Sequence, residues 1–279
     1  MRAKKSFGQH FLTNEDIARR IANALALLSQ VPRVLEVGPG KGMLTKYLLE
    51  KDIDLKAVEA DQDMVDWLNA HYPALHGRLI LRDFLRLDLS EVFPDETPPP
   101  LSDKTGSRHK EFLLIGNFPY NISSQIVFRM LEYRPWIPEM VGMFQKEMAQ
   151  RIIAPPGGKD YGIISVLSQA YYRAEYLFTV GSGNFNPPPK VQSAVIRLTR
   201  RAQAPDCDEA LLRKVVKQSF GQRRKMLRNT LKSFFKDPAV LEESYFTQRP
   251  EVLSVDDFVA LTRRIAAGAD HSSSSDLPK

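Results

Sequence analysis

Apolar residues recur along the chain in two alternating patterns. Short apolar runs, of the length of buried strands, alternate with stretches in which apolar residues recur at helical spacing. Helical stretches such as 44–50 and 64–72 separate the first five of these runs. The predicted strands are residues 33–37, 55–59, 79–82, 112–116, 140–145, 171–180 and 193–200. Strands that alternate with helices predict an α/β fold with a mostly parallel sheet covered by helices.

The pattern changes toward the end of the chain. The last two predicted strands are joined by a loop rich in Gly, Asn and Pro at 181–190, which predicts an antiparallel pair at the sheet edge. From about residue 202 only helical periodicity remains. We therefore expect a first domain at 1–201, a small helical domain at 202–267 and a disordered tail at 268–279, which contains four consecutive serines. The proline-rich segment 94–110 is expected to be a surface excursion.

Composition restricts the possible classes of protein. The 279 residues carry a formal net charge of +6, which is compatible with a polyanionic partner. The single cysteine, Cys207, excludes an internal disulfide and a cysteine metal cluster, and no metal site is expected. No apolar run approaches the ~18 residues that span a bilayer. The basic start at 1–5 lacks the apolar segment of a signal peptide. We expect a cytoplasmic protein.

A glycine-rich turn follows the first predicted strand, in the sequence VLEVGPGKGMLT at 34–45. Glycines between a strand and a helix let the backbone bend sharply and let a ligand approach the main-chain amides. A dinucleotide fingerprint requires G-x-G-x-x-G, and Met43 stands where its third glycine belongs. The form found here is G-x-G-x-G, with Glu36 two residues before it. This form is similar to the nucleoside-methionine loop of class I methyltransferases.

Acidic residues end the next two predicted strands. Glu59, about 20 residues beyond the glycine turn, can accept hydrogen bonds from ribose hydroxyls. Asp83 can accept a hydrogen bond from an adenine amino group, and Phe84 can cover the ring. Each acid taken singly also fits a solvated strand end or a helix cap. Three consecutive strand ends with these residues predict S-adenosylmethionine as the cofactor.

The fourth predicted strand runs into Asn117-Phe118-Pro119-Tyr120. Ligands of a doubly wound sheet lie beyond the carboxyl ends of its strands, so this motif is expected to face the methyl group of the cofactor. The Asn117 side-chain oxygen and the Phe118 carbonyl can accept the two hydrogens of an exocyclic amine while Tyr120 stacks on the base. The motif therefore predicts an adenine or cytosine pocket, in which alignment can supply roughly 7 to 11 kcal/mol of rate enhancement. The alternative is a simple turn with a core tyrosine.

Residues 211–236 are strongly basic. They contain nine Lys or Arg and no acid, whereas a solvated helix face usually mixes both signs. Apolar residues recur there at helical spacing, and Arg224, Arg228, Lys232 and Lys236 are predicted to form an i, i+4 stripe on one helix. RNA is the expected partner. A solvated face and a membrane-surface helix interrupted at Gly221 are the alternatives.

These motifs together resemble a known family. The glycine turn, the strand-end acids and NFPY, with SFGQHFL (6–12), FNPPPKVQSAV (185–195) and FGQRRKMLRNTL (220–231), are similar to the ribosomal RNA adenine N6,N6-dimethyltransferases, within them the bacterial KsgA type. The resemblance runs from about residue 5 to residue 266. It implies a class I methyltransferase with a Rossmann-like seven-stranded sheet and a helical RNA-binding domain. It also implies a monomer that dimethylates two adjacent adenosines in the 3′-terminal hairpin loop of 16S rRNA, with a role in small-subunit biogenesis.

The resemblance assigns roles by matching position. The implied cofactor residues are Gln9, His10, Leu12, Gly38, Gly40, Glu59, Asp83, Phe84 and Asn117. The implied catalytic residues are Asn117, Pro119, Tyr120 and Phe185. The implied RNA-binding residues are Lys190, Arg223, Arg224, Lys225 and Arg228. Phe185 is expected to form a second aromatic wall for the flipped base, and the alternative is a buried ring. His10 stands where the family often has Asn, and Phe118 where Leu is common.

Two other functions fit the same fold. One is a large-subunit rRNA adenine methyltransferase of the kind that confers macrolide resistance. The segments RRKMLRN (223–229) and RPEVLS (249–254) favour the small-subunit type. The other is a ribosome-assembly or transcription factor that has lost the chemistry, which the intact NFPY motif and glycine turn disfavour.

Overall fold

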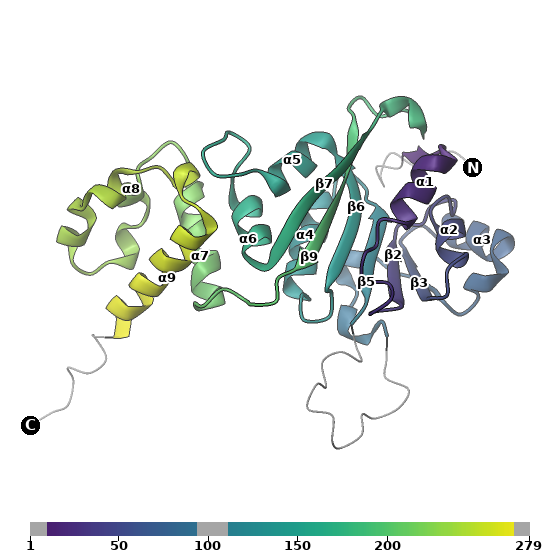
Figure 1. Cartoon of the computed structure of the whole chain (residues 1–279), viewed down its shortest axis with the longest axis horizontal. Coiled ribbons are helices and arrows are strands. Elements are labelled where there is room, and N and C mark those ends of the chain that lie inside the picture. Colours follow the sequence, from purple (N-terminus) through teal and green to yellow (C-terminus); the bar gives the residue numbers. More distant parts are fainter. Residues whose placement is uncertain (1–9, 94–110, 271–279) are drawn as a thin grey trace, which may run out of the picture. The chain divides into compact units, whose positions relative to one another are not determined.

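The computed structural model describes residues 10–93 and 111–270, and these residues fall into two compact units (Figure 1). The first unit contains the chain up to Ala149 together with Arg173–Arg200. The second contains Gln150–Tyr172 and the chain from Arg201 onward. Gln9, the excursion at 94–110 and residues 271–279 lie outside the described residues.

A seven-stranded sheet forms the centre of the first unit, in the order β4-β3-β2-β5-β6-β9-β7. Its strands are β2 (Arg33–Val37), β3 (Asp54–Glu59), β4 (Leu79–Leu81), β5 (Leu113–Asn117), β6 (Glu139–Gln145), β7 (Tyr172–Val180) and β9 (Ser193–Arg200). The pairs among β2 to β6 are parallel, and β9 is antiparallel to β6. The predicted mostly parallel α/β sheet is confirmed, and each strand corresponds to a predicted apolar run.

Burial explains the central strands. Val34 and Leu35 of β2 and Leu113 of β5 are fully buried, as expected for parallel strands covered on both faces. The register pairs Val37 with Val58 and Glu59 with Leu81, so neighbouring parallel strands end at the same edge. The turns that follow these strands and carry the predicted site residues therefore lie at the same edge of the sheet.

Four helices belong to the first unit, and a fifth, α5 (Lys146–Ile153), is divided between the two units after Ala149. The four are α1 (Glu15–Ala22), α2 (Thr45–Leu49), α3 (Gln62–His71) and α4 (Ser123–Glu132). Asn14 caps α1, because its side chain accepts a hydrogen bond from the Ile17 amide at 3.1 Å. Asp61 caps α3 in the same way through Asp63. Asp61 lies only two residues after Glu59. The helix that it caps therefore fixes the end of β3.

A two-stranded ribbon joins segments that are far apart in the sequence. Strand β1 (Phe11–Leu12) pairs antiparallel with β8 (Phe185–Asn186), with Leu12 opposite Phe185. The Thr13 amide also donates to the Asn184 carbonyl at 2.8 Å. The sequence pattern did not predict this ribbon. It brings the segment around His10 to the loop that follows β7.

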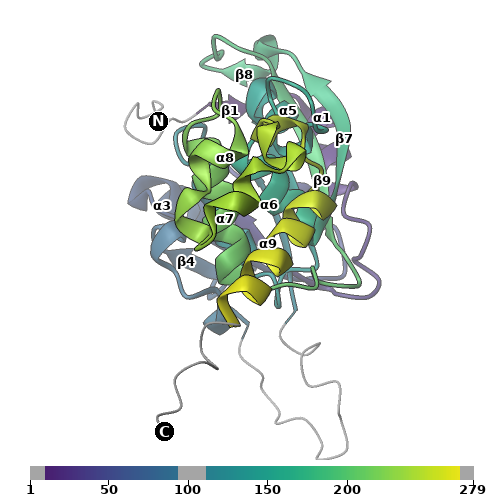
Figure 2. The ribbon, with the colours of Figure 1, turned by 90° about the vertical axis from the view of Figure 1, so that its left-hand side faces the viewer.

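The second unit is helical (Figure 2). Its helices are α6 (Ile163–Tyr171), α7 (Glu209–Gly221), α8 (Leu227–Thr230) and α9 (Val255–Asp270). Short 3-10 turns η7 (Lys232–Phe234), η8 (Pro238–Glu242), η9 (Ser244–Thr247) and η10 (Pro250–Val252) lie between α8 and α9. Because α6 packs on α7 and α9, this unit includes residues 150–172, which we had expected in the first domain. Helix α9 extends to Asp270, three residues into the expected tail.

The predicted basic stripe is wrong. Helix α7 ends at Gly221, and α8 covers only Leu227–Thr230 before the chain turns into η7. The Leu227 amide donates to the Gln248 carbonyl at 2.8 Å and not to a carbonyl one helical turn back. The four cations of the expected stripe therefore do not share one helix. Within the described ranges, no helix is both long and apolar enough to cross a membrane.

Candidate active site

A cavity of about 640 Å³ lies at the carboxyl ends of β2, β3, β4 and β5. This volume is in the range of small-molecule sites. Its lining includes the predicted residues His10, Leu12, Gly38, Gly40, Glu59, Asp83, Phe84, Asn117, Pro119 and Tyr120. Among the residues that the structure describes, Phe185 is the one predicted cofactor or catalytic residue that does not line it. The cavity also includes Glu36, Lys41 and Tyr72, to which we had assigned no role.

The glycine turn forms one wall of the cavity. Gly38, Gly40 and Gly42 all have positive φ, and Gly42 in addition packs closely against Tyr72. A Cβ on Gly42 would lie 2.4 Å from the Tyr72 ring, and the Tyr72 hydroxyl donates to the Gly42 carbonyl at 3.2 Å. Only glycine allows both this backbone conformation and this approach. Tyr72 thus supports the turn from outside the motif.

Glu59 is buried beside the glycine turn, and its carboxylate accepts three main-chain hydrogen bonds. The donors are the amides of Gly40 at 3.2 Å, Ala60 at 2.8 Å and Asp61 at 3.0 Å. Burial raises the pKa of Glu59, while these three amides oppose the shift. A carboxylate offers about four lone-pair positions, so a position remains at Oε2, the oxygen that only Gly40 contacts.

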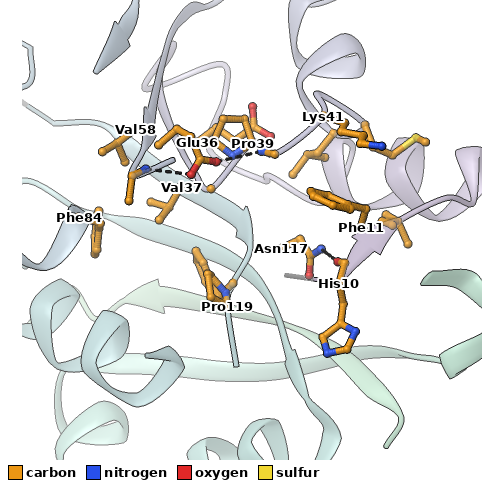
Figure 3. Close-up of a pocket in the computed structure, with 18 of the residues that line it drawn as sticks. His10, Phe11, Glu36, Val37, Pro39, Lys41, Val58, Phe84, Asn117 and Pro119 are labelled. Atoms are coloured by element: carbon orange, nitrogen blue, oxygen red, sulfur yellow. Dashed lines mark hydrogen bonds between the residues drawn. The ribbon is translucent and has the colours of Figure 1, made fainter. Parts of the chain in front are cut away.

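Glu36 is a second buried carboxyl in the cavity wall (Figure 3). Its exposed fraction is 1%, and its Oε2 accepts a hydrogen bond from the Thr45 hydroxyl at 2.7 Å. Burial raises the pKa of Glu36 to about 8, and the charge of Glu59 adds to the shift. At neutral pH the Glu36 carboxyl is therefore mostly protonated. Burial thus raises the pKa of both carboxyls, Glu36 and Glu59.

Asp83 and Phe84 follow strand β4, whereas the glycine turn follows β2. The Asp83 carboxylate accepts a hydrogen bond from the Leu85 amide at 2.9 Å, which starts the 3-10 turn η3 (Phe84–Arg86). Phe84 is 4% exposed and lines the cavity, whereas Leu81 is 45% exposed. The cap holds Asp83 in place with acceptor capacity left for an amine. The ring and Leu81 supply apolar surface for a nucleobase.

Asn117 ends β5, and its side chain is oriented by the chain's N-terminal segment. The Asn117 Nδ2 donates to the main-chain carbonyl of His10 at 3.1 Å (Figure 3). Because the amide nitrogen is turned toward His10, the side-chain oxygen of Asn117 is directed away from this segment and can accept a hydrogen bond. This is the orientation that an incoming amine requires.

Phe118 fits a slot made by two glycines. Its ring is 1% exposed, and a Cβ on Gly142 of β6 would lie 2.2 Å from it. A Cβ on Gly116 would lie 2.8 Å from the same ring. The Phe118 amide donates to the Met143 carbonyl at 3.1 Å, so its main chain continues the pairing of β5 with β6. The aromatic residue in place of the more common Leu is thus accommodated within the core.

Tyr120 is held by a residue of β9, a strand separated from β5 by β6. Its hydroxyl lies 2.6 Å from the hydroxyl of Ser193, which is fully buried at the start of β9. The imidazole of His10 stacks on the Tyr120 ring with 5.3 Å between centroids. Burial raises the pKa of Tyr120, while the Ser193 hydrogen bond opposes the shift. No pattern in the sequence indicated that Ser193 fixes this ring.

Phe185 does not form the second aromatic wall that we had predicted. Its ring is 4% exposed and packs in the hydrophobic core with Leu12, Val180 and Val195. The pairing of β8 with β1 turns it inward. This is the buried alternative that the sequence had left open, and the ring that faces Tyr120 is that of His10.

The predicted RNA-binding residues are divided between the two units. Lys190 is exposed in the first unit, and Arg224 and Lys225 are exposed in the second. The Arg223 guanidinium donates to the Gly158 carbonyl at 2.8 Å and to the Lys159 carbonyl. Arg228 is half-buried. Arg223 therefore has a structural contact, and the RNA contacts of all five stay a prediction.

Comparison with known proteins places these features in a family. Residues 1–261 match the family model described as ribosomal RNA adenine dimethylase. The chain is 48% identical over 268 residues to ribosomal RNA small subunit methyltransferase A of Flavobacterium johnsoniae, covering 96% of this chain and 97% of that protein. It is 51% identical over 267 residues to the protein of that name from Porphyromonas gingivalis, covering 94% and 97%.

Solved structures agree in fold. A dimethyladenosine transferase from Plasmodium falciparum superposes with a TM-score of 0.73 at 22% identity, covering 93% of this chain and 98% of that one. The 23S rRNA methyltransferase ErmE superposes with a TM-score of 0.63 at 25% identity, covering 92% and 99%. The sheet is that of a class I methyltransferase. With a family match over 261 residues and two relatives near 50% identity, the chain belongs to the ribosomal RNA adenine dimethylase family.

Proposed function

We propose that the protein dimethylates the N6 amino groups of two adjacent adenosines in the 3′-terminal hairpin loop of 16S rRNA during small-subunit biogenesis. The observation that carries the proposal is that Asn117 and Tyr120 line the same cavity as the glycine turn and Glu59. S-adenosylmethionine, the cofactor of this enzyme class, supplies the methyl groups. Family membership and the relatives near 50% identity support this choice of reaction.

The cavity residues fit an adenosyl cofactor. Gly38 and Gly40 expose main chain beside the cavity, and the Glu59 Oε2 retains acceptor capacity for a ribose hydroxyl. A second ribose hydrogen bond to Glu59 requires the Gly40 amide, which is its longest contact at 3.2 Å, to give way. Asp83 and Phe84 offer an acceptor and an apolar face to the adenine.

The target base occupies the other end of the cavity. The Asn117 side-chain oxygen, left as an acceptor by the bond to His10, accepts one hydrogen of the adenine amine. The Phe118 carbonyl accepts the second. Two accepted hydrogen bonds draw the amine nitrogen from planar toward tetrahedral geometry. This makes its lone pair available to attack the methyl group that is to be transferred. Tyr120, fixed by Ser193, stacks on the base and holds it in line. Pro119 keeps the turn between these residues rigid.

The substrate is a folded RNA, which contacts more of the protein than the cavity. Exposed Arg224 and Lys225 of the second unit and Lys190 of the first are suited to phosphate contacts. An enzyme that acts on a base inside a hairpin loop must take that base out of its stack. We infer that it works as a monomer in the cytoplasm, where the ribosomal subunits are assembled.

Mapping the methylated adenosines tests the proposal. Unmodified small and large ribosomal subunits are incubated with the protein and labelled S-adenosylmethionine, and primer extension locates the modified bases. We expect two adjacent stops in the 3′-terminal hairpin of the small-subunit RNA. Stops only in large-subunit RNA would instead support the second candidate, a large-subunit adenine methyltransferase, which the similarity to ErmE favours. Binding without any methyl transfer would support a non-catalytic assembly factor.

A further inference from the structure

His10 contacts the base end of the cavity twice, once with its main chain and once with its side chain. The carbonyl accepts the Asn117 hydrogen bond at 3.1 Å. The imidazole stacks on Tyr120, with 5.3 Å between ring centroids and 27° between ring planes. The imidazole Nδ1 donates to the Pro187 carbonyl at 2.8 Å. The ring thus lies on the tyrosine that the proposed function assigns to the target adenine.

The spacing of the two rings excludes a base between them. A planar base between two rings requires roughly 7 Å, twice the contact distance of about 3.5 Å between carbon atoms. The observed distance between the His10 and Tyr120 centroids is 5.3 Å. An adenine can therefore stack on this face of Tyr120 only after the imidazole has moved.

We propose that the His10 imidazole covers the stacking face of Tyr120 until the target adenine displaces it, and that His10 in this way controls access of the base. The inference rests on the proposed function, because it needs Tyr120 to receive a base. One stack and one hydrogen bond to an exposed loop carbonyl hold the ring, so a side-chain rotation releases it. The main-chain bond to Asn117 is unaffected by such a rotation, so the acceptor for the amine stays in place.

Because a base must displace the His10 imidazole, the pocket favours bases that stack more strongly on Tyr120. A purine has a larger ring area than an imidazole and gains more from stacking on Tyr120. A smaller ring gains less from the exchange. His10 therefore acts on binding of the base through Tyr120.

Two substitutions separate the stack from the hydrogen bond. His10→Ala removes both side-chain interactions, whereas His10→Asn removes the ring but keeps a donor for the Pro187 carbonyl. Both keep the main-chain carbonyl that orients Asn117. We expect each variant to lower the KM for unmodified small ribosomal subunits by roughly twofold to tenfold, the range of one aromatic pair. The KM is measured at saturating S-adenosylmethionine, because His10 also lines the cavity beside the cofactor residues.

A Tyr120→Ala background supplies the control. Without the tyrosine ring there is no stack to displace, so His10→Asn should no longer tighten binding of unmodified small subunits in a filter assay. Calorimetry of S-adenosylmethionine binding to each variant checks that the cofactor end is intact. A gain that persists in the Tyr120→Ala background would overturn the inference.

The remaining outcomes are equally distinct. If both His10 variants show an unchanged or higher KM, the ring does not compete with the base and the inference is wrong. If His10→Ala raises the KM and His10→Asn restores it, the hydrogen bond to Pro187 has a structural role instead. Failure of the proposed function looks different, because wild-type protein would then bind cofactor and transfer no methyl groups to small subunits.

Discussion

The two ends of the cavity are built in different ways. At the nucleoside end, the glycine turn, Glu59 and Asp83 follow directly from consecutive strands, and their partners lie mostly in the same turns. At the base end, Asn117 and Tyr120 depend on His10 and Ser193, which lie 107 and 73 residues away from them in sequence. The nucleoside end is thus a local product of the sheet. The base end exists only once distant segments have met.

This difference predicts that changes at the base end act on turnover, and changes at the nucleoside end act on cofactor affinity and stability. We expect Asn117→Ala to slow methyl transfer by on the order of 100-fold to 1000-fold, as removal of one positioned polar group does in other enzymes. RNA affinity should be retained, because phosphate contacts dominate it. Single-turnover transfer of labelled methyl groups and filter binding measure the two effects.

The exposed Asn69 of α3 provides the control for that experiment, because it does not line the cavity. Asn69→Ala removes the same kind of amide without touching the bond to His10. Equal losses in the two variants would show that the Asn117 side chain has no specific role.

Gly42→Ala should be the most destabilising change at the nucleoside end. The new methyl group would lie 2.4 Å from Tyr72, at a φ of +81° that costs a non-glycine residue about 1 to 2 kcal/mol by itself. We expect a total loss of about 3 kcal/mol in the free energy of unfolding, measured by urea denaturation. Gly77→Ala is the control, because its φ is +75° and nothing lies within 4 Å of the added atom. If both variants lose the same stability, Tyr72 does not restrict the turn.

Glu59→Gln should weaken S-adenosylmethionine about tenfold to a hundredfold. Each hydrogen bond to a charged acceptor is worth roughly 1.5 to 3 kcal/mol, and the amide offers one acceptor atom in place of two. Titration calorimetry measures the affinity. Glu50→Gln removes an equal charge at an exposed position outside the cavity and should have no effect. Unchanged affinity in a folded Glu59→Gln variant would refute the ribose assignment.

Glu36 adds a pH dependence to the nucleoside end. Because burial raises the pKa of Glu36 from 4.5 to about 8, the folded protein keeps a proton that the unfolded chain releases between these values. This contribution is full below about pH 4.5 and declines as the pH rises toward 8, by at most about 1.4 kcal/mol per pH unit. Between pH 5 and 8, the midpoint temperature of thermal unfolding should fall more steeply with pH in the wild type than in Glu36→Gln. Parallel curves would contradict the assignment.

The smallest effects are expected at residues of the second unit that do not line the cavity. Neutralising Arg224 and Lys225 should reduce the log-log salt dependence of RNA binding by roughly 0.7 to 0.9 for each phosphate that the variant no longer neutralises. Cofactor affinity should not change, since both residues are outside the cavity lining. Filter binding of a small-subunit rRNA fragment at several salt concentrations measures the slope. An unaltered slope would assign these two residues to a solvated face.

The same difference between the two ends explains which features of the fold and of the site could be predicted from the sequence. Apolar runs predicted all seven strands of the sheet, and the pattern is most direct in central strands such as β2 and β5, which are buried on both faces. Glu59 and Asp83 could be assigned because parallel strands end at one edge. The β1–β8 ribbon and the contacts of Tyr72 and Ser193 could not, since they depend on pairs far apart in sequence.

Two predictions failed for identifiable reasons. The basic stripe assumed one helix, whereas the chain leaves α7 at Gly221 and the Leu227 amide bonds to Gln248. Phe185 was assigned to the pocket by resemblance, but pairing with Leu12 buries its ring. In both cases a contact between segments far apart or separate in the sequence decided the outcome.

The identity of the methylated nucleoside tests the central claim most directly, namely that Asn117 and Tyr120 present an adenine amine to a methyl donor. Unmodified small subunits are incubated with wild-type protein and labelled S-adenosylmethionine, and the RNA is digested to nucleosides for mass spectrometry. We predict that the label is found in N6,N6-dimethyladenosine and is lost with Asn117→Ala. Label in a different nucleoside, or equal labelling by Asn117→Ala, would contradict the account.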